Sequence, residues 1–291
     1  MRIVIDAIIT GVLSGGIYVL MALGLTLIFG VMDIINVGQG ALVILGAYLS
    51  YVLQQHLHID LFLGLLITMP VMFAFGVALE AAFVRPIRWE RTTLSILITF
   101  AIALLIQGAL SLVFSTNLVQ MHAWYVDHSV KIGSFYLAWV YIFDFLLSVV
   151  LVAGLYLLLN RTRFGASLRA SMQNRTAAQL IGIDVERVSA ITFGIGVALA
   201  AAGGMAYGAT SSFNPNSQYD LISRLLAIII LGGMGSLRGA VVAGFGMLVI
   251  EDVTSVVWSP VWASTVFYMA LVVVLVVRPQ GLFGRLAGRR Q

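Results

Sequence analysis

Apolar runs long enough to cross a lipid bilayer recur along the whole chain. A transmembrane helix needs about 20 mostly apolar residues to cross roughly 30 Å of hydrocarbon. Hydropathy predicts such spans at residues 5–29, 34–53, 61–84, 94–114, 138–159, 188–209 and 262–277, with a longer apolar tract at 221–250. Only 10% of the 291 residues are charged, which is too few to solvate the surface of a soluble domain. We therefore expect an all-α, polytopic membrane bundle of eight or nine transmembrane segments with glycine-broken helices, forming one domain over residues 1–291.

The positions of the arginines orient this bundle. Twelve of the sixteen basic residues lie in three segments, at 85–91, 161–187 and 278–290. Cytoplasmic loops carry an excess of lysine and arginine, so we place these segments in the cytoplasm. Both ends of the 221–250 tract then lie outside, so the tract has to turn back at the glycine-rich segment 232–239. Counted as two helices, the tract gives nine spans and an outside N-terminus; counted as one, it gives eight.

A second glycine-rich break, at 30–41, separates the first two spans. Non-helical backbone at membrane depth is tolerated where it is buried in protein or lines a cavity, and paired broken helices are typical of transport pathways. Polar side chains inside apolar spans are also costly and tend to face a pathway. These patterns predict the following translocation-pathway residues: Asn36, Gln39, Gly40, Ser95, Thr99, Gln107, Gly232 and Gly233. The alternative role for the polar ones is hydrogen bonding between helices.

The longest basic segment, 161–187, contains a short helix between two spans. Its composition favours helix from about 165 to 180, Gly182 is a natural stop, and Asp184 can cap the next helix. A short exposed helix of this kind can dock into a groove of another protein. The residues expected at this coupling contact are Arg169, Met172, Asn174, Arg175, Ala177, Ala178, Leu180 and Gly182. The residues alone leave open an interfacial connector with its arginines at lipid headgroups.

Several kinds of chemistry have no residues to support them in this sequence. No G-x-x-x-x-G-K-[ST] phosphate loop is present, so the chain does not hydrolyse ATP by that mechanism. No acid–base or metal-ligand cluster is visible, so we expect no catalytic residue, no metal site and no cofactor in this chain. The net charge of +4 is explained by cytoplasmic arginines rather than by nucleic-acid binding. Few charges lie within the spans, whereas a proton- or sodium-coupled carrier usually shows them. This scarcity favours a subunit driven by partner ATPases, and a stand-alone secondary carrier or channel for a small polar solute is the alternative interpretation.

Five stretches, taken in order, carry a family resemblance. They are GLTLIFG at 24–30 with INVGQG at 35–40, RP at 85–86, the stretch leading to Gly182, LGGMGS at 231–236 with GA at 239–240, and RPQGLFG at 278–284. In this order they resemble the branched-chain amino acid permease family of ABC importers, in particular its H-type subunit. The segment 161–187 resembles the coupling loop of these permeases, although it lacks the acidic residue of their Glu-Ala-Ala pattern. Gln39 stands where many relatives carry a histidine.

The resemblance implies an importer built from several chains. The expected partners are a second, related permease subunit, two cytoplasmic ABC ATPases that bind ATP and Mg, a periplasmic substrate-binding protein and the lipid bilayer. The implied function is translocation of a small solute, a branched-chain or related amino acid or an amide, through a bacterial inner (plasma) membrane. Coupling would run through the segment 161–187 docked on the ATPase.

Overall fold

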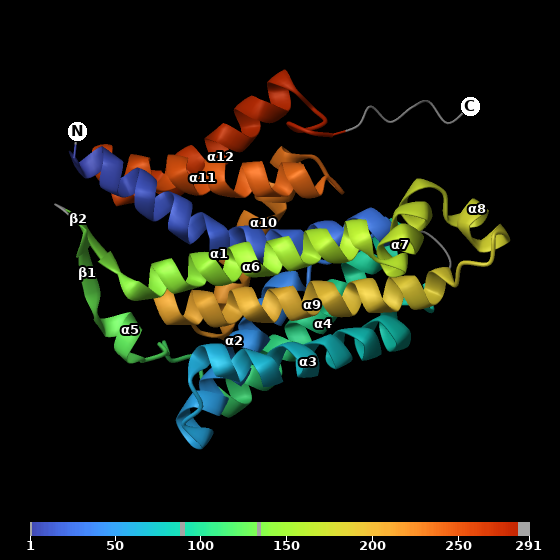
Figure 1. The fold of residues 1–291 in the computed structure, drawn as a ribbon, viewed down its shortest axis with the longest axis horizontal. Coiled ribbons are helices and arrows are strands. Elements are labelled where there is room, and N and C mark those ends of the chain that lie inside the picture. Colours follow the sequence, from blue (N-terminus) through green and yellow to red (C-terminus); the bar gives the residue numbers. More distant parts are fainter. Residues whose placement is uncertain (1, 88–90, 133–134, 285–291) are drawn as a thin grey trace.

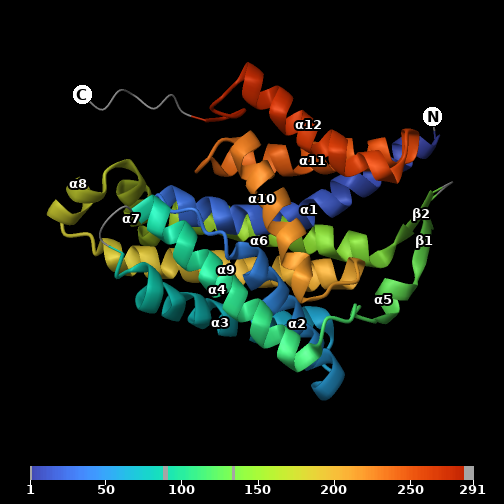
Figure 2. The ribbon, with the colours of Figure 1, turned by 180° about the vertical axis from the view of Figure 1, so that it is seen from behind.

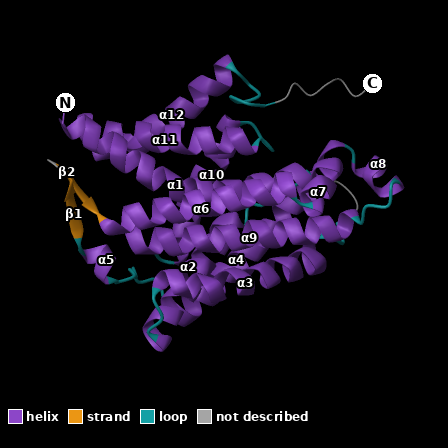
Figure 3. Cartoon of the chain, viewed as in Figure 1, coloured by secondary structure: helices purple, strands orange, loops and turns teal. Residues whose placement is uncertain are grey.

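The computed structural model describes residues 2–87, 91–132 and 135–284, which form a helical bundle with one small hairpin at its edge (Figures 1 and 3). The longer helices are α1 (Arg2–Met32), α2 (Gln39–Leu57), α3 (Leu61–Leu79), α4 (Arg91–Phe114), α6 (Trp139–Arg161), α9 (Val185–Thr210), α10 (Gln218–Gly232), α11 (Leu237–Val257) and α12 (Pro260–Val277). The shorter ones are α5 (Trp124–Asp127), α7 (Arg163–Gln173), α8 (Arg175–Leu180), the π-helix η1 (Glu80–Val84) and the 3-10 helix η2 (Pro215–Ser217). The predicted all-α membrane bundle is confirmed. Four arginines of the basic segments lie outside the described residues: Arg88, Arg285, Arg289 and Arg290.

Seven described helices are long and apolar enough to cross a membrane. They are α1, α3 with its continuation η1, α4, α6, α9, α11 and α12. The helices α2 and α10, with 19 and 15 residues, fall outside this set. These two apolar helices lie where the nine-span count places its remaining two segments, so among the described residues seven helices meet the criterion and two do not.

The two ends of the bundle carry different elements. The helices α7 and α8 lie at one end with the last described residues, while the N-terminus, α5 and the hairpin lie at the other (Figures 1 and 2). The hairpin pairs β1 (Ser129–Ile132) with β2 (Phe135–Ala138) in antiparallel register and was not predicted from the sequence. The positive-inside rule predicts that the arginine-rich end with α7 is cytoplasmic, and on that prediction the N-terminus is at the outer end.

Both glycine-rich breaks are present, with a shifted boundary at the first. The helix α2 begins only at Gln39, so the helix predicted from residue 34 is wrong over 34–38. Asp33 has a left-handed backbone with φ of 53°, which ends α1 and turns the chain out of the helix. The second break is as predicted, because residues 233–236 separate α10 from α11.

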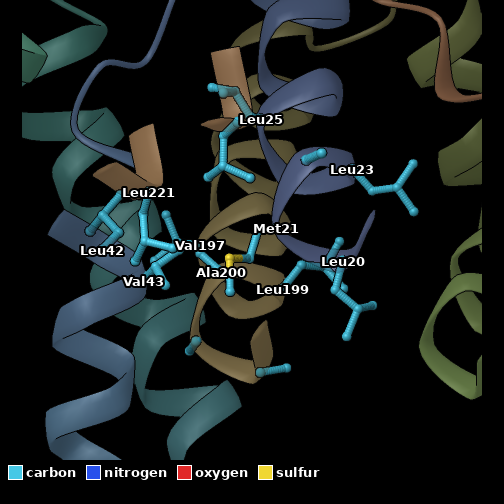
Figure 4. Packing of buried hydrophobic residues seen from close by; sticks show 14 of the residues in the cluster. Leu20, Met21, Leu23, Leu25, Leu42, Val43, Val197, Leu199, Ala200 and Leu221 are labelled. Carbon is cyan, nitrogen blue, oxygen red and sulfur yellow. The ribbon is translucent and has the colours of Figure 1, made fainter. Parts of the chain in front are cut away.

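The helix α9 forms the centre of the bundle. Its membrane-crossing window is 89% buried, against 11–33% for α3, α4, α6, α11 and α12. Small residues from Ala200 to Gly204 let the neighbouring helices approach closely, and a side chain at Gly204 would collide with the backbone of Val43 in α2. Apolar side chains of α1, α2, α9 and α10 pack around this contact (Figure 4). The five peripheral helices therefore have apolar sides free to meet lipid or another chain.

Candidate functional site

The first break carries buried polar side chains. Asn36 donates from Nδ2 to Oε1 of Gln39 (3.1 Å), and Gln39 donates from Nε2 to the backbone oxygen of Gly196 in α9 (3.3 Å). Both side chains belong to residues that are at most 1% exposed. These amides therefore tie the 33–38 segment to the central helix.

The helix α4 holds the other side of the same segment. The Thr99 hydroxyl accepts a hydrogen bond from the backbone N–H of Val37 (3.1 Å) and donates to the backbone oxygen of Ser95 (2.7 Å). The structure thus brings together four of the predicted pathway residues: Asn36, Gln39, Ser95 and Thr99. Their polar atoms bind each other and the backbone. This arrangement corresponds to hydrogen bonding between helices, the alternative role that the sequence left open.

Gln107 belongs to a separate polar group, nearer the outer end of α4. Its Nε2 donates to Oδ1 of Asn216 (2.6 Å), and its Oε1 accepts from Nε2 of Gln218 (2.6 Å) and from the Tyr219 hydroxyl (2.7 Å). Gln107 was predicted as a pathway residue from the sequence, and the other three were not. Their signal was a run of polar residues directly before the apolar tract at 221–250.

Gly40 lies between the two polar groups. A side chain at this position would collide with the backbone oxygen of Gln218, so the first turns of α2 and α10 touch here. The first residues of two membrane helices therefore lie next to each other at Gly40 and Gln218. A helix N-terminus carries a partial positive charge from its free N–H groups.

A row of polar side chains follows the exposed side of α10. Asn216 of η2 and Tyr219, Asp220 and Ser223 of α10 are exposed at helical spacing, and the half-buried Gln107 of α4 bonds to the first of them. We name these five residues the polar face. The helix α10 contacts both α2 and α11 and crosses the bundle obliquely, well away from its two ends (Figure 2). Because polar groups are strongly disfavoured in hydrocarbon, the polar face requires water or another protein chain beside it.

A buried ion pair fixes α10 against α11. The Arg224 guanidinium donates from Nη1 to both carboxylate oxygens of Glu251 (2.6 and 2.5 Å) and from Nε to Asp220 (2.9 Å). The Arg224 side chain is only 15% exposed, and its guanidinium carbon lies 5.7 Å from the ring centre of Phe267 in α12. This pair was not predicted from the sequence. An arginine inside a predicted span was a usable signal, because a charge at membrane depth needs a partner.

Gly232 and Gly233 lie at the other end of α10, about 20 Å along the helix axis from its first residue. Part of the RPQGLFG motif packs against them. Leu282 donates its backbone N–H to the backbone oxygen of Leu231 (2.7 Å). Phe283 donates its backbone N–H to the backbone oxygen of Gly232 (3.1 Å). The structure therefore places these two glycines at the C-terminal segment and not at the polar face.

The cytoplasmic segment forms two short helices, so the single helix predicted over 165–180 is wrong. The helices α7 and α8 meet at Asn174, whose backbone is extended (φ −156°, ψ 106°). The Asn174 side chain caps α8 by accepting a hydrogen bond from the N–H of Ala177 (3.0 Å). The turn at Asn174 places α8 at the tip of the cytoplasmic end (Figure 1).

Both predicted boundaries after this segment are present. Gly182 has a left-handed backbone with φ of 85° just after α8. Asp184 caps α9 by accepting a hydrogen bond from the N–H of Arg187 (3.0 Å).

Three of the predicted coupling residues face the bundle. Met172 lies against α1, where it would meet a side chain added at Gly30. Ala178 is 2% exposed, and the Arg169 guanidinium donates to the backbone oxygen of Leu159 in α6. These three residues attach α7 and α8 to the membrane helices.

The other predicted coupling residues lie on the outer side of the segment. Asn174, Ala177, Leu180 and Gly182 are exposed, and Arg175 is half-buried. Leu180 is 83% exposed, and Ile181, which was not among the predicted coupling residues, is 75% exposed. Two neighbouring apolar side chains at a cytoplasmic tip form a surface that a partner protein can cover.

A bundle of membrane-crossing helices with two broken helices, a polar face at membrane depth and an exposed cytoplasmic helix pair defines a multi-pass membrane permease. The chain matches the family described as "Branched-chain amino acid transport system / permease component" over residues 7–276, and it belongs to that family. It is a permease subunit of an ABC importer, as the resemblance implied.

Relatives of known function extend over nearly the whole chain. It is similar to the high-affinity branched-chain amino acid transport system permease protein LivH of Escherichia coli (strain K12), with 28% identity over 94% of both chains. It is also similar to the permease protein BraD of Pseudomonas aeruginosa, with 25% identity over 97% of this chain and 96% of BraD. The probable LivH of Methanocaldococcus jannaschii is 27% identical over 94% of this chain and 90% of the relative. No solved structure matches the chain at a significant level.

Proposed function

We propose that this chain is the translocating subunit of an ATP-driven importer for a branched-chain or related amino acid, or an amide, in a bacterial inner (plasma) membrane. The relatives named above are permeases for branched-chain amino acids. The polar face carries the proposal, because its amide, phenol, carboxylate and hydroxyl groups are exposed at membrane depth. Such groups suit a path for a small polar solute and not a surface against lipid.

The other chains of the importer supply what this one lacks. A second, related permease covers the polar face and closes the path between the two subunits. A periplasmic binding protein delivers the solute at the outer end of the bundle. Two cytoplasmic ABC ATPases bind ATP and Mg, because this chain has no phosphate loop of its own.

The segment 161–187 transmits the motion of the ATPase in this proposal. Leu180 and Ile181 provide the exposed apolar contact for the ATPase. Arg169 and Met172 connect the same segment to α6 and α1. A displacement of α8 by the ATPase is therefore passed to two membrane helices.

Reconstitution tests the transport step directly. The complete importer is placed in proteoliposomes with ATP at the side of the ATPases, and uptake of radiolabelled leucine, isoleucine and valine is measured. We expect uptake to require ATP and the binding protein. Uptake by this chain alone without ATP would instead identify a stand-alone carrier or channel.

The substitution Leu180→Glu tests the coupling contact. Leucine gains free energy when an apolar contact buries it, and a charged carboxylate at the same place does not. ATPase co-purification with the tagged chain should therefore fall roughly tenfold or more. Leu118→Glu is the matched control, since Leu118 is 69% exposed in the loop at the outer end. If Leu180→Glu retains as much ATPase as Leu118→Glu, the contact lies elsewhere on the chain.

A further inference from the structure

A groove lies on the side of the bundle away from the polar face. It has a volume of about 590 Å³ and opens between α6, α7 and the start of α11, with Phe283 of the C-terminal segment at its edge. The helix α6 lies on one side of the bundle, and α4 and α10 lie on the other (Figures 1 and 2). The groove is therefore separate from the proposed translocation path.

The deep part of the groove is apolar. It is lined by Leu23 of α1, Val152 and Leu155 of α6, and Val241 of α11. Val152 lies nine residues before the end of α6, which is about 13 Å along the helix axis. The hydrocarbon of one leaflet is about 15 Å thick, half of the roughly 30 Å core. The groove thus extends from the cytoplasmic interface through most of the inner leaflet.

The cytoplasmic rim of the groove is basic. Arg169 of α7 and Arg238 of α11 both line it, and both are exposed. One guanidinium nitrogen of Arg169 donates to the backbone oxygen of Leu159, and the same group has further N–H donors for a ligand. None of the described residues that line the groove is acidic. A guanidinium group presents a planar set of donors that matches a phosphate group, and it retains its charge at the interface. The groove therefore combines a site for an anionic phosphate with an apolar channel of acyl-chain length.

We propose that this groove binds an anionic phospholipid of the cytoplasmic leaflet. Its phosphate would lie between Arg169 and Arg238, and one acyl chain would lie along Leu155 and Val152. Basic pockets between membrane helices on the cytoplasmic side bind anionic headgroups in this way. The chain's own C-terminal residues 285–291 do not suit the rim, because they carry three arginines. A bound phosphate would bridge α7 of the coupling segment to the first turn of α11.

Lipid retention by the purified full chain tests the proposal. The chain is exchanged into detergent with phosphatidylglycerol or phosphatidylcholine, and bound lipid is counted by native mass spectrometry. We expect phosphatidylglycerol to be retained in preference to phosphatidylcholine. Arg238→Gln should reduce that retention roughly tenfold, as expected for the loss of one charged hydrogen-bonding partner. Val152→Trp should reduce it as well, by filling the acyl-chain part without changing the charge.

Arg187→Gln is the matched control, because it removes the same charge from a cytoplasmic side chain that is 78% exposed and does not line the groove. It should retain phosphatidylglycerol like the unsubstituted chain. Equal retention of the two lipids by the unsubstituted chain would overturn the proposal. Equal retention by Arg238→Gln and Arg187→Gln would overturn it too, since binding would then follow net charge alone. Both replaced side chains are exposed, so the comparison does not depend on a change in the core.

Discussion

The contact between Arg224 and Glu251 shows how two charges are kept inside an apolar bundle. The arginine uses donors on two nitrogens to bind Glu251 and Asp220, and Glu251 is only 8% exposed. A buried charge is stable when it is paired, and removing one partner leaves the other uncompensated. The pair therefore positions α10, and with it the polar face, relative to α11.

The substitution Arg224→Met should destabilise the chain by about 3–5 kcal/mol, because it leaves Glu251 buried without a partner. The double substitution Arg224→Met with Glu251→Leu should recover most of that loss, since neither charge remains. Thermal unfolding of the purified chain in detergent measures both. Arg187→Met removes an arginine from the exposed pair with Asp184 and should change stability by about 1 kcal/mol or less. If Arg224→Met is no less stable than Arg187→Met, the buried pair contributes little to the stability of the chain.

Individual polar residues could be selected from the sequence, but their partners could not. Asn36 and Gln107 are both polar residues near or within apolar spans, and the same rule selected both. In the structure Asn36 binds Gln39 in the interior, whereas Gln107 joins the exposed polar face. The difference depends on contacts between residues far apart in the sequence, such as the bond from Gln39 to Gly196. Hydropathy within one span carries no information about such contacts.

At the scale of elements, the turn between α10 and α11 depends on one backbone conformation. Gly233 has φ of 95°, and a side chain there would collide with the backbone of Gly284. The C-terminal segment therefore fits against the turn only when residue 233 has no side chain.

The substitution Gly233→Val should abolish most uptake while the chain still inserts into the membrane. The strained φ alone costs about 1–3 kcal/mol, and the collision displaces the segment that ends at Gly284. Uptake by the complete importer and the amount of chain in the membrane are measured together. Gly246→Val is the control, because Gly246 lies in α11 with open space around its Cα. Normal uptake by Gly233→Val would show that this turn tolerates a different backbone.

The elements themselves were largely predictable, since apolar length alone located the membrane helices. Apart from the hairpin, which the sequence did not predict, the errors lie at two helix boundaries. Asp33 leaves the helix with a left-handed backbone, and Asn174 caps a new helix inside a helical sequence. Asparagine is a preferred N-cap, so the second boundary had a visible signal. The boundary at Asp33 had no such signal in the sequence, because aspartate adopts a left-handed backbone only where the surrounding chain selects it.

At the scale of the whole molecule, the peripheral helices present two kinds of surface. The side with α4 and α10 carries the polar face, and the side with α6 carries exposed leucines and valines (Figures 1 and 2). Sequence could not distinguish these sides, because α4 and α6 are both strongly apolar. The hydrogen bonds from Gln107 of α4 to Gln218 and Tyr219 at the start of α10 show which side carries the polar face.

The absence of cysteine from the chain makes this assignment measurable. A thiol reacts as the thiolate, which forms readily only in contact with water. Ser223→Cys, on the polar face, should therefore react with a membrane-impermeant thiol reagent at least about tenfold faster than Leu157→Cys, which lies on α6 and replaces a leucine that is 57% exposed. The measurement uses membrane vesicles that contain the complete importer, with labelling followed by mass shift. Protection of Ser223→Cys by the transported amino acid would place the solute at the polar face. Equal labelling at the two positions would mean that the polar face meets no aqueous path, and the proposed route along α10 would be wrong.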